Sequence, residues 1–213
     1  MNDYVQANRK LWNEWTGLHL DSNYYDLNGF KAGKVTLGAV ERREVGDVSG
    51  KSLLHLQCHL GLDALSWARL GAAVTGVDIS DESIHVAQAL SDEFNVPAQF
   101  ICSDIYELPQ VLDRQFDIVF TTCGVLTWLP DLQRWAKIIT HYLKPGGMFY
   151  INEIHPIKRV LTPRLQDDRG NPITIGVSAR ISFGRTAQLS SGVLDSSEAL
   201  TKRHGREHTP RQP

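Results

Sequence analysis

Residues 51–80 read KSLLHLQCHLGLDALSWARLGAAVTGVDIS, and this stretch decides the fold class. An apolar run over 51–56 predicts a short strand, and apolar residues at helical spacing over 62–70 predict a helix. A second apolar run over 73–77 ends on Asp78. Because these strands are almost continuously apolar and a helix separates them, they are typical of a parallel sheet that is covered on both faces.

The same alternation of strand and helix continues along the chain. Ser80 can cap a second helix, whose first turn carries two acidic residues where the helix dipole favours them. Further strands are predicted over 98–102, 116–121 and 148–153, and a helix begins at Pro130 between the last two. The sequence therefore predicts an α/β fold, a doubly wound and mainly parallel sheet with right-handed crossovers.

Composition places the chain among ordinary globular proteins. It has 213 residues, of which 42% are hydrophobic and 22% charged, with a net charge of −2, so nothing in its charge indicates nucleic acid. The longest uncharged stretch has 13 residues, fewer than the roughly 20 that a membrane helix needs. The start also has no apolar signal-peptide region, and we expect a cytoplasmic protein without a membrane partner.

The chain changes character near residue 157. Residues 1–156 carry 12 basic and 19 acidic side chains, whereas residues 157–213 carry 10 basic and 5 acidic ones. Strict alternation of apolar residues over 173–183 predicts one half-buried strand, on the sheet edge or in a small hairpin. An uncovered edge would promote self-association. Residues 184–213 hold only four leucine or valine residues, and we expect them to be disordered.

Two aspartates mark the expected ligand site. In doubly wound sheets the ligand lies beyond the carboxyl ends of the strands, where Asp78 and Asp104 follow the second and third predicted strands. Asp78 could accept hydrogen bonds from both hydroxyls of a ribose, and Asp104 could accept one from an adenine amino group. The alternatives are that Asp78 only leads into the next helix and that Asp104 only begins a turn. Together the two carboxylates favour a nucleoside site.

Four segments resemble the successive motifs of the class I S-adenosylmethionine-dependent methyltransferases. They are residues 52–80, ICSDIYELP at 101–109, FDIVFTTCGVLTWLPD at 116–131 and LKPGGMFYINEIHP at 143–156. More narrowly, they look like a bacterial small-molecule branch whose first loop reads Gln-Cys-His instead of Gly-Cys-Gly. The resemblance implies a Rossmann-like methyltransferase fold with S-adenosylmethionine as cofactor and a small-molecule acceptor. It ends near Gly176, beyond which the family's C-terminal strands look missing or altered.

The resemblance also implies which residues hold the cofactor. They are Gln57, Cys58, His59 and Gly61 around the methionine part, Asp78 and Ile79 at the ribose, Asp104 and Ile105 at the adenine, and Cys123 near the sulfonium. Of the loop glycines that the family usually has, only Gly61 remains. Gln57 and His59 are therefore expected in ordinary backbone regions, or else under strain. The three cysteines lie far apart, and we predict no metal site and no disulfide.

Two further groups of residues are candidates for substrate contact. Glu153 and His155 lie at alternate positions after the fifth strand, where either could act as a general base or merely cap the sheet. By resemblance, residues 1–50 form a helical lid over the cofactor-binding core of residues 51–156. Its aromatic residues Trp15, Tyr24 and Tyr25 would face the substrate.

Three functions follow as hypotheses. The leading one is transfer of a methyl group from S-adenosylmethionine to an oxygen, nitrogen or carbon of a small acceptor. The second is a protein of the same fold, with an altered C-terminus, that binds the cofactor without turnover. The third, a nicotinamide-dependent oxidoreductase, is disfavoured because the chain lacks the G-x-G-x-x-G loop that a pyrophosphate requires.

Overall fold

The computed structural model describes residues 3–22, 25–154 and 176–182 of the 213. Its centre is a six-stranded sheet in the order β3-β2-β1-β4-β5-β6. The strands are β1 (Ser52–Leu56), β2 (Ala73–Asp78), β3 (Gln99–Cys102), β4 (Phe116–Thr121), β5 (Leu143–Ile154) and β6 (Gly176–Ser182). The pairs among β1 to β5 are parallel, and β6 is antiparallel to β5. The doubly wound sheet is confirmed, and its order reverses at β1, which creates a ligand crevice between β1 and β4.

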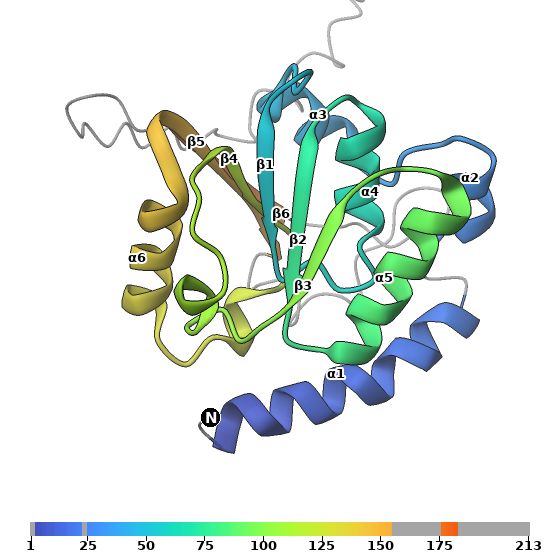
Figure 1. The fold of residues 1–213 in the computed structure, drawn as a ribbon, viewed down its shortest axis with the longest axis horizontal. Coiled ribbons are helices and arrows are strands. Elements are labelled where there is room, and N and C mark those ends of the chain that lie inside the picture. The colour runs from blue at the N-terminus through green and yellow to red at the C-terminus, as the bar shows by residue number, and fades with distance from the viewer. Residues whose placement is uncertain (1–2, 23–24, 155–175, 183–213) are drawn as a thin grey trace, which may run out of the picture.

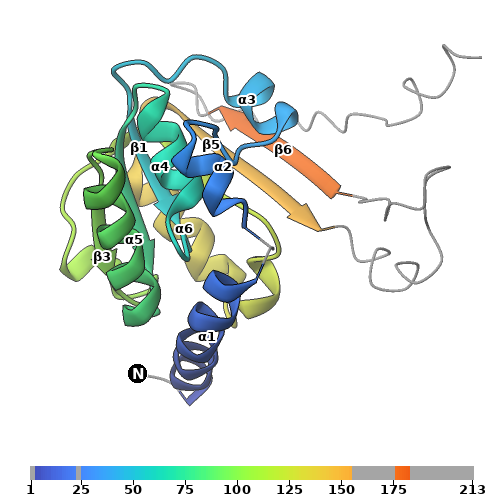
Figure 2. The ribbon, with the colours of Figure 1, turned by 90° about the vertical axis from the view of Figure 1, so that its right-hand side faces the viewer.

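Helices cover both faces of this sheet. They are α1 (Asp3–Asp21), α2 (Leu27–Lys31), α3 (Ala39–Val45), α4 (Leu62–Arg69), α5 (Asp81–Phe94) and α6 (Leu132–Tyr142), with short 3-10 turns η1 (Leu108–Gln110) and η2 (Leu126–Trp128). In Figure 1, α6 lies on one side of the sheet, and α2, α4 and α5 lie on the other. Helix α1 runs across the bottom of this view, below the carboxyl ends of the strands, and Figure 2 shows it there from the side. No helix in the described ranges is long and apolar enough to cross a membrane.

The central strand β1 is buried on both faces, which explains its nearly continuous apolar sequence. Leu54 and Leu56 belong to the apolar cluster that includes Trp135 of α6. Leu53 points the other way, into the cluster that contains Trp67 of α4. All three leucines are fully buried, and the sheet is therefore sandwiched between two apolar layers.

The helix ends explain where the polar residues of the sequence lie. Ser80 caps α5 by accepting a hydrogen bond from the backbone N–H of Ser83 at 3.0 Å, which confirms the predicted cap. In contrast, α6 does not begin at Pro130. Asp131 caps it by accepting from Arg134 N at 2.8 Å, and the first helical residue is Leu132. The Asp131 carboxylate satisfies a free N–H of the first turn, so Asp131 is the cap and Pro130 precedes it.

The outer strands differ from the expected ones in length. Strand β5 begins at Leu143 and not at residue 148, because Leu143 pairs with Phe116 before the register shifts at Ile118. Strand β6 lies within the expected range 173–183 and covers the outer edge of β5 from Met148 to Ile154. The expected disorder of residues 184–213 falls outside the described residues, and self-association through the edge stays a prediction.

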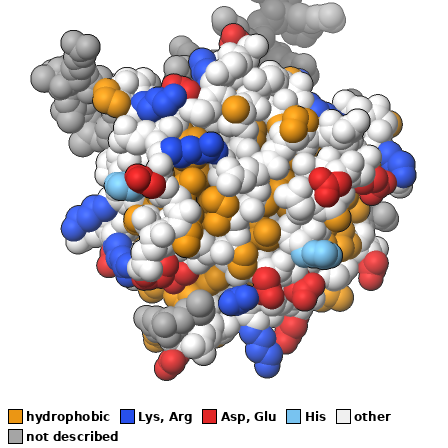
Figure 3. All heavy atoms as spheres, in the orientation of Figure 1, with side chains coloured by type: hydrophobic (Ala, Val, Ile, Leu, Met, Phe, Trp, Pro, Cys, Tyr) orange, Lys and Arg blue, Asp and Glu red, His pale blue; other side chains and the backbone are white. Residues whose placement is uncertain are grey.

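Charges of both signs are interspersed over the face drawn in Figure 3. Blue and red side chains surround a band of hydrophobic ones that crosses the middle of this face. No extended basic patch is visible on it, and extended basic patches are the usual electrostatic mark of nucleic-acid binding.

We predict that Gly76→Ala destabilises the fold. A Cβ atom at Gly76, in the middle of β2, would lie 2.7 Å from the ring of Phe100 and 2.9 Å from Cys58 Sγ. Overpacking a buried site of this kind costs about 1–3 kcal/mol of the free energy of unfolding. Denaturant unfolding should therefore show a lower midpoint with an unchanged slope.

Gly17→Ala is the matched control for this substitution. Gly17 is an exposed residue inside α1, and a Cβ there would meet no atom within 4 Å. Alanine should leave the free energy of unfolding unchanged or raise it by up to about 1 kcal/mol. A Gly76→Ala protein that unfolds at the denaturant concentration of the parent would contradict the packing described for β2 and β3.

Candidate functional site

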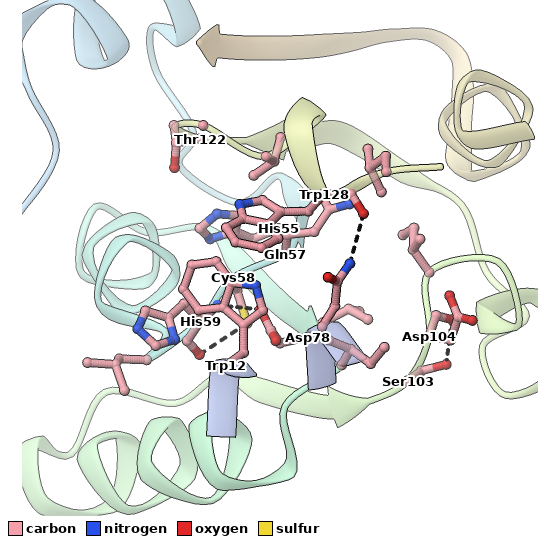
Figure 4. Close-up of a pocket in the computed structure, with 18 of the residues that line it drawn as sticks. Trp12, His55, Gln57, Cys58, His59, Asp78, Ser103, Asp104, Thr122 and Trp128 are labelled. Carbon is pink, nitrogen blue, oxygen red and sulfur yellow. Dashed lines mark hydrogen bonds between the residues drawn. The ribbon is translucent and has the colours of Figure 1, made fainter. Parts of the chain in front are cut away.

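A cavity of about 260 Å³ opens at the carboxyl ends of the strands. Its walls come from the segments that follow β1, β2, β3 and β4, and helix α1 contributes a further side. Figure 4 shows Asp104 at one end and Thr122 at the other, with Asp78 and Trp12 between them. Parallel strands thus bring polar residues that are far apart in the sequence to a single site.

Three carboxylates line the cavity in the order of the strands. Asp104 follows β3, Asp78 ends β2, and Asp63 lies in the first turn of α4, which follows β1. Among the described residues that line this cavity there is no lysine or arginine. The site therefore presents negative charge without a neighbouring cation, which favours a ligand that carries positive charge.

Asp78 is anchored by the backbone on both of its oxygens. Oδ2 accepts from the N–H of His59 at 2.8 Å, and Oδ1 accepts from the N–H of Ser80 at 3.0 Å. Burial raises the pKa of the carboxyl group, and these backbone hydrogen bonds act against that shift. Each oxygen keeps a lone pair, so the anchored carboxylate can still accept from ligand hydroxyls.

Asp104 and Asp63 are each held by neighbouring donors. Asp104 Oδ1 accepts from the backbone N–H of Tyr106 at 3.0 Å, so the residue begins a turn and also lines the cavity. Asp63 accepts from the hydroxyls of Thr36, at 2.5 Å, and Thr122, at 3.2 Å. Burial raises the pKa of Asp63, and the two threonine hydroxyls act against that shift.

The loop after β1 adopts left-handed backbone conformations without the usual glycines. The φ angles are 54° at Gln57, 49° at His59 and 72° at Gly61. Of the two alternatives for Gln57 and His59, the strained one is observed, and it costs about 1–2 kcal/mol for each side chain that carries a Cβ. Gly61 does not line the cavity. Instead, a Cβ there would lie 2.7 Å from the ring of Phe100, so this position needs a glycine.

Helix α1 supplies the aromatic wall of the site, but with a different tryptophan from the expected one. Trp12 and Tyr25 line the cavity together with Trp128. Trp15 does not line it and packs edge-on against Trp12, with ring centroids 5.3 Å apart. The two tryptophans are three residues apart on one face of α1 and both pack against Trp128, but it is Trp12 that lines the cavity. Tyr24 lies outside the described residues.

Residues 54–151 match the family model of the methyltransferase domain. Over this segment the chain is similar to the methyltransferase domain family.

Two ubiquinone biosynthesis O-methyltransferases are similar to this chain. The chain is 28% identical over 155 residues to the ubiquinone biosynthesis O-methyltransferase of Chromobacterium violaceum, covering 73% of this chain and 62% of that protein. It is 31% identical over 141 residues to the enzyme of the same name from Idiomarina loihiensis, covering 64% of this chain and 57% of that protein. The chain thus spans about three-fifths of the length of these relatives.

A solved structure supports the fold. The magnesium protoporphyrin IX methyltransferase of Synechocystis, with bound S-adenosylmethionine, matches with a TM-score of 0.56 at 18% identity. The match covers 74% of this chain and 79% of that one. At this level of identity the likeness concerns the fold alone.

Buried polar atoms without a described partner line this cavity. His55 is buried in β1, and neither of its ring nitrogens has a hydrogen-bond partner among the described residues. Nε2 of Gln57 is likewise buried without a described partner, and both residues line the cavity. Buried polar atoms are normally hydrogen-bonded, so these atoms indicate that a ligand with polar groups belongs here. Burial also lowers the pKa of His55 to about 3, so the ring is neutral.

Glu153 is placed differently from the expected general base. Its Oε2 accepts from the backbone N–H of Gly124 at 3.0 Å and of Ile154 at 2.9 Å, and its Oε1 accepts from Leu126 N at 2.9 Å. The residue does not line the cavity, but Gly124 does. Its carboxylate holds the loop after β4 in place, so the sheet-capping alternative describes it better. His155 lies outside the described residues.

The other expected cofactor residues line the cavity. They are Gln57, Cys58, His59, Asp78, Ile79, Asp104, Ile105 and Cys123. The sequence analysis singled out neither Asp63, Trp128 nor His55, all of which line the cavity. A search for polar residues in the first turn of α4 would have found Asp63, because that turn begins at the expected crevice. In the described part of the chain, no group of three or more His, Cys, Asp or Glu residues could hold a metal ion.

We predict that Glu153→Gln lowers stability and leaves the affinity for S-adenosylhomocysteine nearly unchanged. The amide nitrogen would face a backbone N–H that now donates to a carboxylate oxygen, and a lost hydrogen bond of this kind costs about 1–3 kcal/mol. Thermal unfolding should show the lower stability, and calorimetric titration should show the affinity.

Glu93→Gln is the matched control, because Glu93 forms only an exposed ion pair with Lys31. The free energy of unfolding of this variant should stay within about 0.5 kcal/mol of the parent value. Unchanged stability of Glu153→Gln would show that its carboxylate does not hold the loop after β4.

Proposed function

We propose that this methyltransferase binds S-adenosylmethionine across the strand ends and transfers its methyl group to an oxygen of a small acceptor. The observation that carries the proposal is the row of Asp104, Asp78 and Asp63 in a cavity with no described lysine or arginine. S-adenosylmethionine has an adenine amino group, two ribose hydroxyls and an ammonium group, all of which donate hydrogen bonds to carboxylates. A nicotinamide dinucleotide has a negative pyrophosphate, which this row of carboxylates would repel.

Each carboxylate has a partner of matching chemistry in this proposal. Asp104 would accept from the adenine amino group, Asp78 from the ribose hydroxyls, and Asp63 from the ammonium group. Gln57 Nε2 could donate to the carboxylate of the cofactor. When bound, the cofactor supplies an electrophilic methyl group on a positive sulfur. The rings of Trp12, Tyr25 and Trp128 add cation–π stabilisation of about 0.5–2 kcal/mol when a cation lies over them.

The residues of the chain contribute mainly positioning and exclusion of water. Displacement at a methyl group needs the acceptor atom in line with the leaving sulfur, and holding that geometry can supply about 7–11 kcal/mol. Helix α1 closes the cavity from below with Val5, Asn8 and Trp12. Asn8 Nδ2 donates to the carbonyl of Trp128 at 3.0 Å and so links this helix to the opposite wall.

The choice of oxygen as the acceptor atom rests on the relatives, whose names describe them as O-methyltransferases. The test is formation of S-adenosylhomocysteine from S-adenosylmethionine with a panel of phenols, catechols, carboxylic acids and amines. We expect turnover with one or more phenols or catechols. Turnover with amines alone would contradict oxygen transfer, and binding without any turnover would favour the protein that only binds the cofactor.

We predict that Asp78→Ala weakens binding of S-adenosylhomocysteine about tenfold to 150-fold, because hydrogen bonds to a charged group contribute about 1.5–3 kcal/mol. Isothermal titration calorimetry measures the affinity, and far-UV circular dichroism checks that the variant is folded. The control is Asp92→Ala, which removes an exposed carboxylate of α5. Equal affinities of the Asp78 variant and the parent would refute the ribose assignment.

A further inference from the structure

Helix α1 is attached to the core through polar side chains. Only Val5 and Thr16 of this helix are buried among its described residues. Asn13 accepts from Ser80 Oγ at 2.7 Å, and its amide donates to Asp81 Oδ1 at 2.9 Å. Arg9 Nε donates to the same carboxylate oxygen at 3.0 Å. The helix that closes the cavity is thus joined to the start of α5 by hydrogen bonds.

One chain of hydrogen bonds leaves α1, passes through the loop between β1 and α4 (residues 57–61, hereafter the cofactor loop) and returns to α1. His19 Nδ1 lies 2.8 Å from His59 Nε2, and His59 Nδ1 lies 2.9 Å from Ser83 Oγ. Ser83 Oγ lies 2.7 Å from Thr16 Oγ1, which donates to the carbonyl of Trp12 at 2.8 Å. The three elements α1, the β1–α4 loop and α5 meet in this chain.

The hydrogen bond from Thr16 Oγ1 to the Trp12 carbonyl determines which group donates and which accepts in the other hydrogen bonds of this chain. A carbonyl only accepts, so the single hydroxyl proton of Thr16 goes to Trp12, and Thr16 must accept from Ser83. Ser83 has then used its own proton and must accept from Nδ1–H of His59. Burial lowers the pKa of His59 to about 4, so its ring is neutral and Nε2 carries a lone pair. That lone pair accepts from Nδ1–H of His19.

His59 also controls the geometry of the cofactor site through its backbone. Its N–H donates to Asp78 Oδ2 at 2.8 Å, and its φ angle of 49° is in the left-handed region. A residue with a Cβ stays in this region only where its surroundings hold it. The side chain of His59 is held on both ring nitrogens, by α1 on one side and α5 on the other.

We propose that His19 is a positioning residue for cofactor binding. By donating to the Nε2 lone pair of His59, it supports the Nδ1–H tautomer that Thr16 and Ser83 set, and it holds the His59 backbone N–H on Asp78. Docking of α1 and the shape of the cofactor loop are therefore coupled through one hydrogen bond. The effect on cofactor affinity rests on the proposed function, whereas the tautomer and the N–H of His59 belong to the protein alone.

The first experiment uses the cofactor-free protein. Long-range ¹H–¹⁵N spectra of the imidazole rings at neutral pH identify which nitrogen of His59 is protonated. We expect the Nδ1–H form in the parent protein. Thr16→Val keeps the shape of Thr16 but removes its hydroxyl, so Ser83 is free to donate to His59 Nδ1, and the Nε2–H form should appear. An Nε2–H tautomer in the parent protein would overturn the proposal.

The second experiment substitutes His19 itself. His19→Phe keeps a ring against Trp12 and Tyr25 and removes the donor, whereas His19→Asn places an amide N–H where Nδ1 lies. The His59 backbone N–H should exchange with solvent faster in the phenylalanine variant and at the parent rate in the asparagine variant. The Kd for S-adenosylhomocysteine should rise roughly two- to twelvefold in the phenylalanine variant alone, as expected for one lost hydrogen bond.

Leu18→Ala is the control on the same helical turn, because the Leu18 side chain is 65% exposed. It should leave both the exchange rate and the Kd unchanged. Equal exchange of the His59 N–H in parent and His19→Phe would overturn the proposal, whatever the affinity. A parent protein that binds no S-adenosylhomocysteine would refute the proposed function, and the tautomer and exchange results would still decide the role of His19.

Discussion

The carboxylate of Asp78 is the junction on which the rest of the site depends. It terminates β2 and accepts the backbone N–H groups of His59 and Ser80, so one side chain ties the loop after β1 to the start of α5. The loop after β1 lines the cavity, and both segments carry hydrogen-bond partners of α1. Because a buried carboxylate needs several donors, the backbone is forced to converge on it. The end of β2, the loop after β1 and the start of α5 are consequently held together by hydrogen bonds to a charged group as well as by apolar packing.

A second constraint is the imbalance of charge around the cavity. Three aspartates line it without a lysine or arginine among the described residues, and burial raises the pKa of two of them, Asp63 and Asp78. Such a site is more stable with a cation than without one, since burial disfavours an unpaired carboxylate. The same imbalance separates the proposed cofactor from a dinucleotide. Selectivity for the proposed cofactor over a dinucleotide therefore arises from the charge of the cavity and does not depend on the acceptor.

Much of this arrangement could be predicted from the sequence, and the exceptions have physical causes. The alternation of strands and helices, the Ser80 cap and the positions of Asp78 and Asp104 follow from periodicity, from capping preferences and from the rule that ligands bind at strand ends. Periodicity carries no information on φ angles, so it could not predict the left-handed backbone conformations of Gln57 and His59. Nor does it show which hydrogen bonds a carboxylate makes. Glu153 lies at a position where a general base was expected, yet its carboxylate accepts hydrogen bonds from three backbone N–H groups. The pairing of His19 with His59 joins residues 40 positions apart and has no local signal.

The position of Glu153 has a mechanical consequence for the molecule. Its backbone pairs with Val177 of β6, and its carboxylate accepts hydrogen bonds from the N–H groups of Gly124 and Leu126. Glu153 therefore connects the outermost strand, β6, to the loop after β4, which forms part of the cavity wall. A shift of β6 along β5 would pull on the backbone of Glu153 and so displace the loop after β4. Whatever fixes the outer border of the sheet therefore also affects the position of this wall of the cavity.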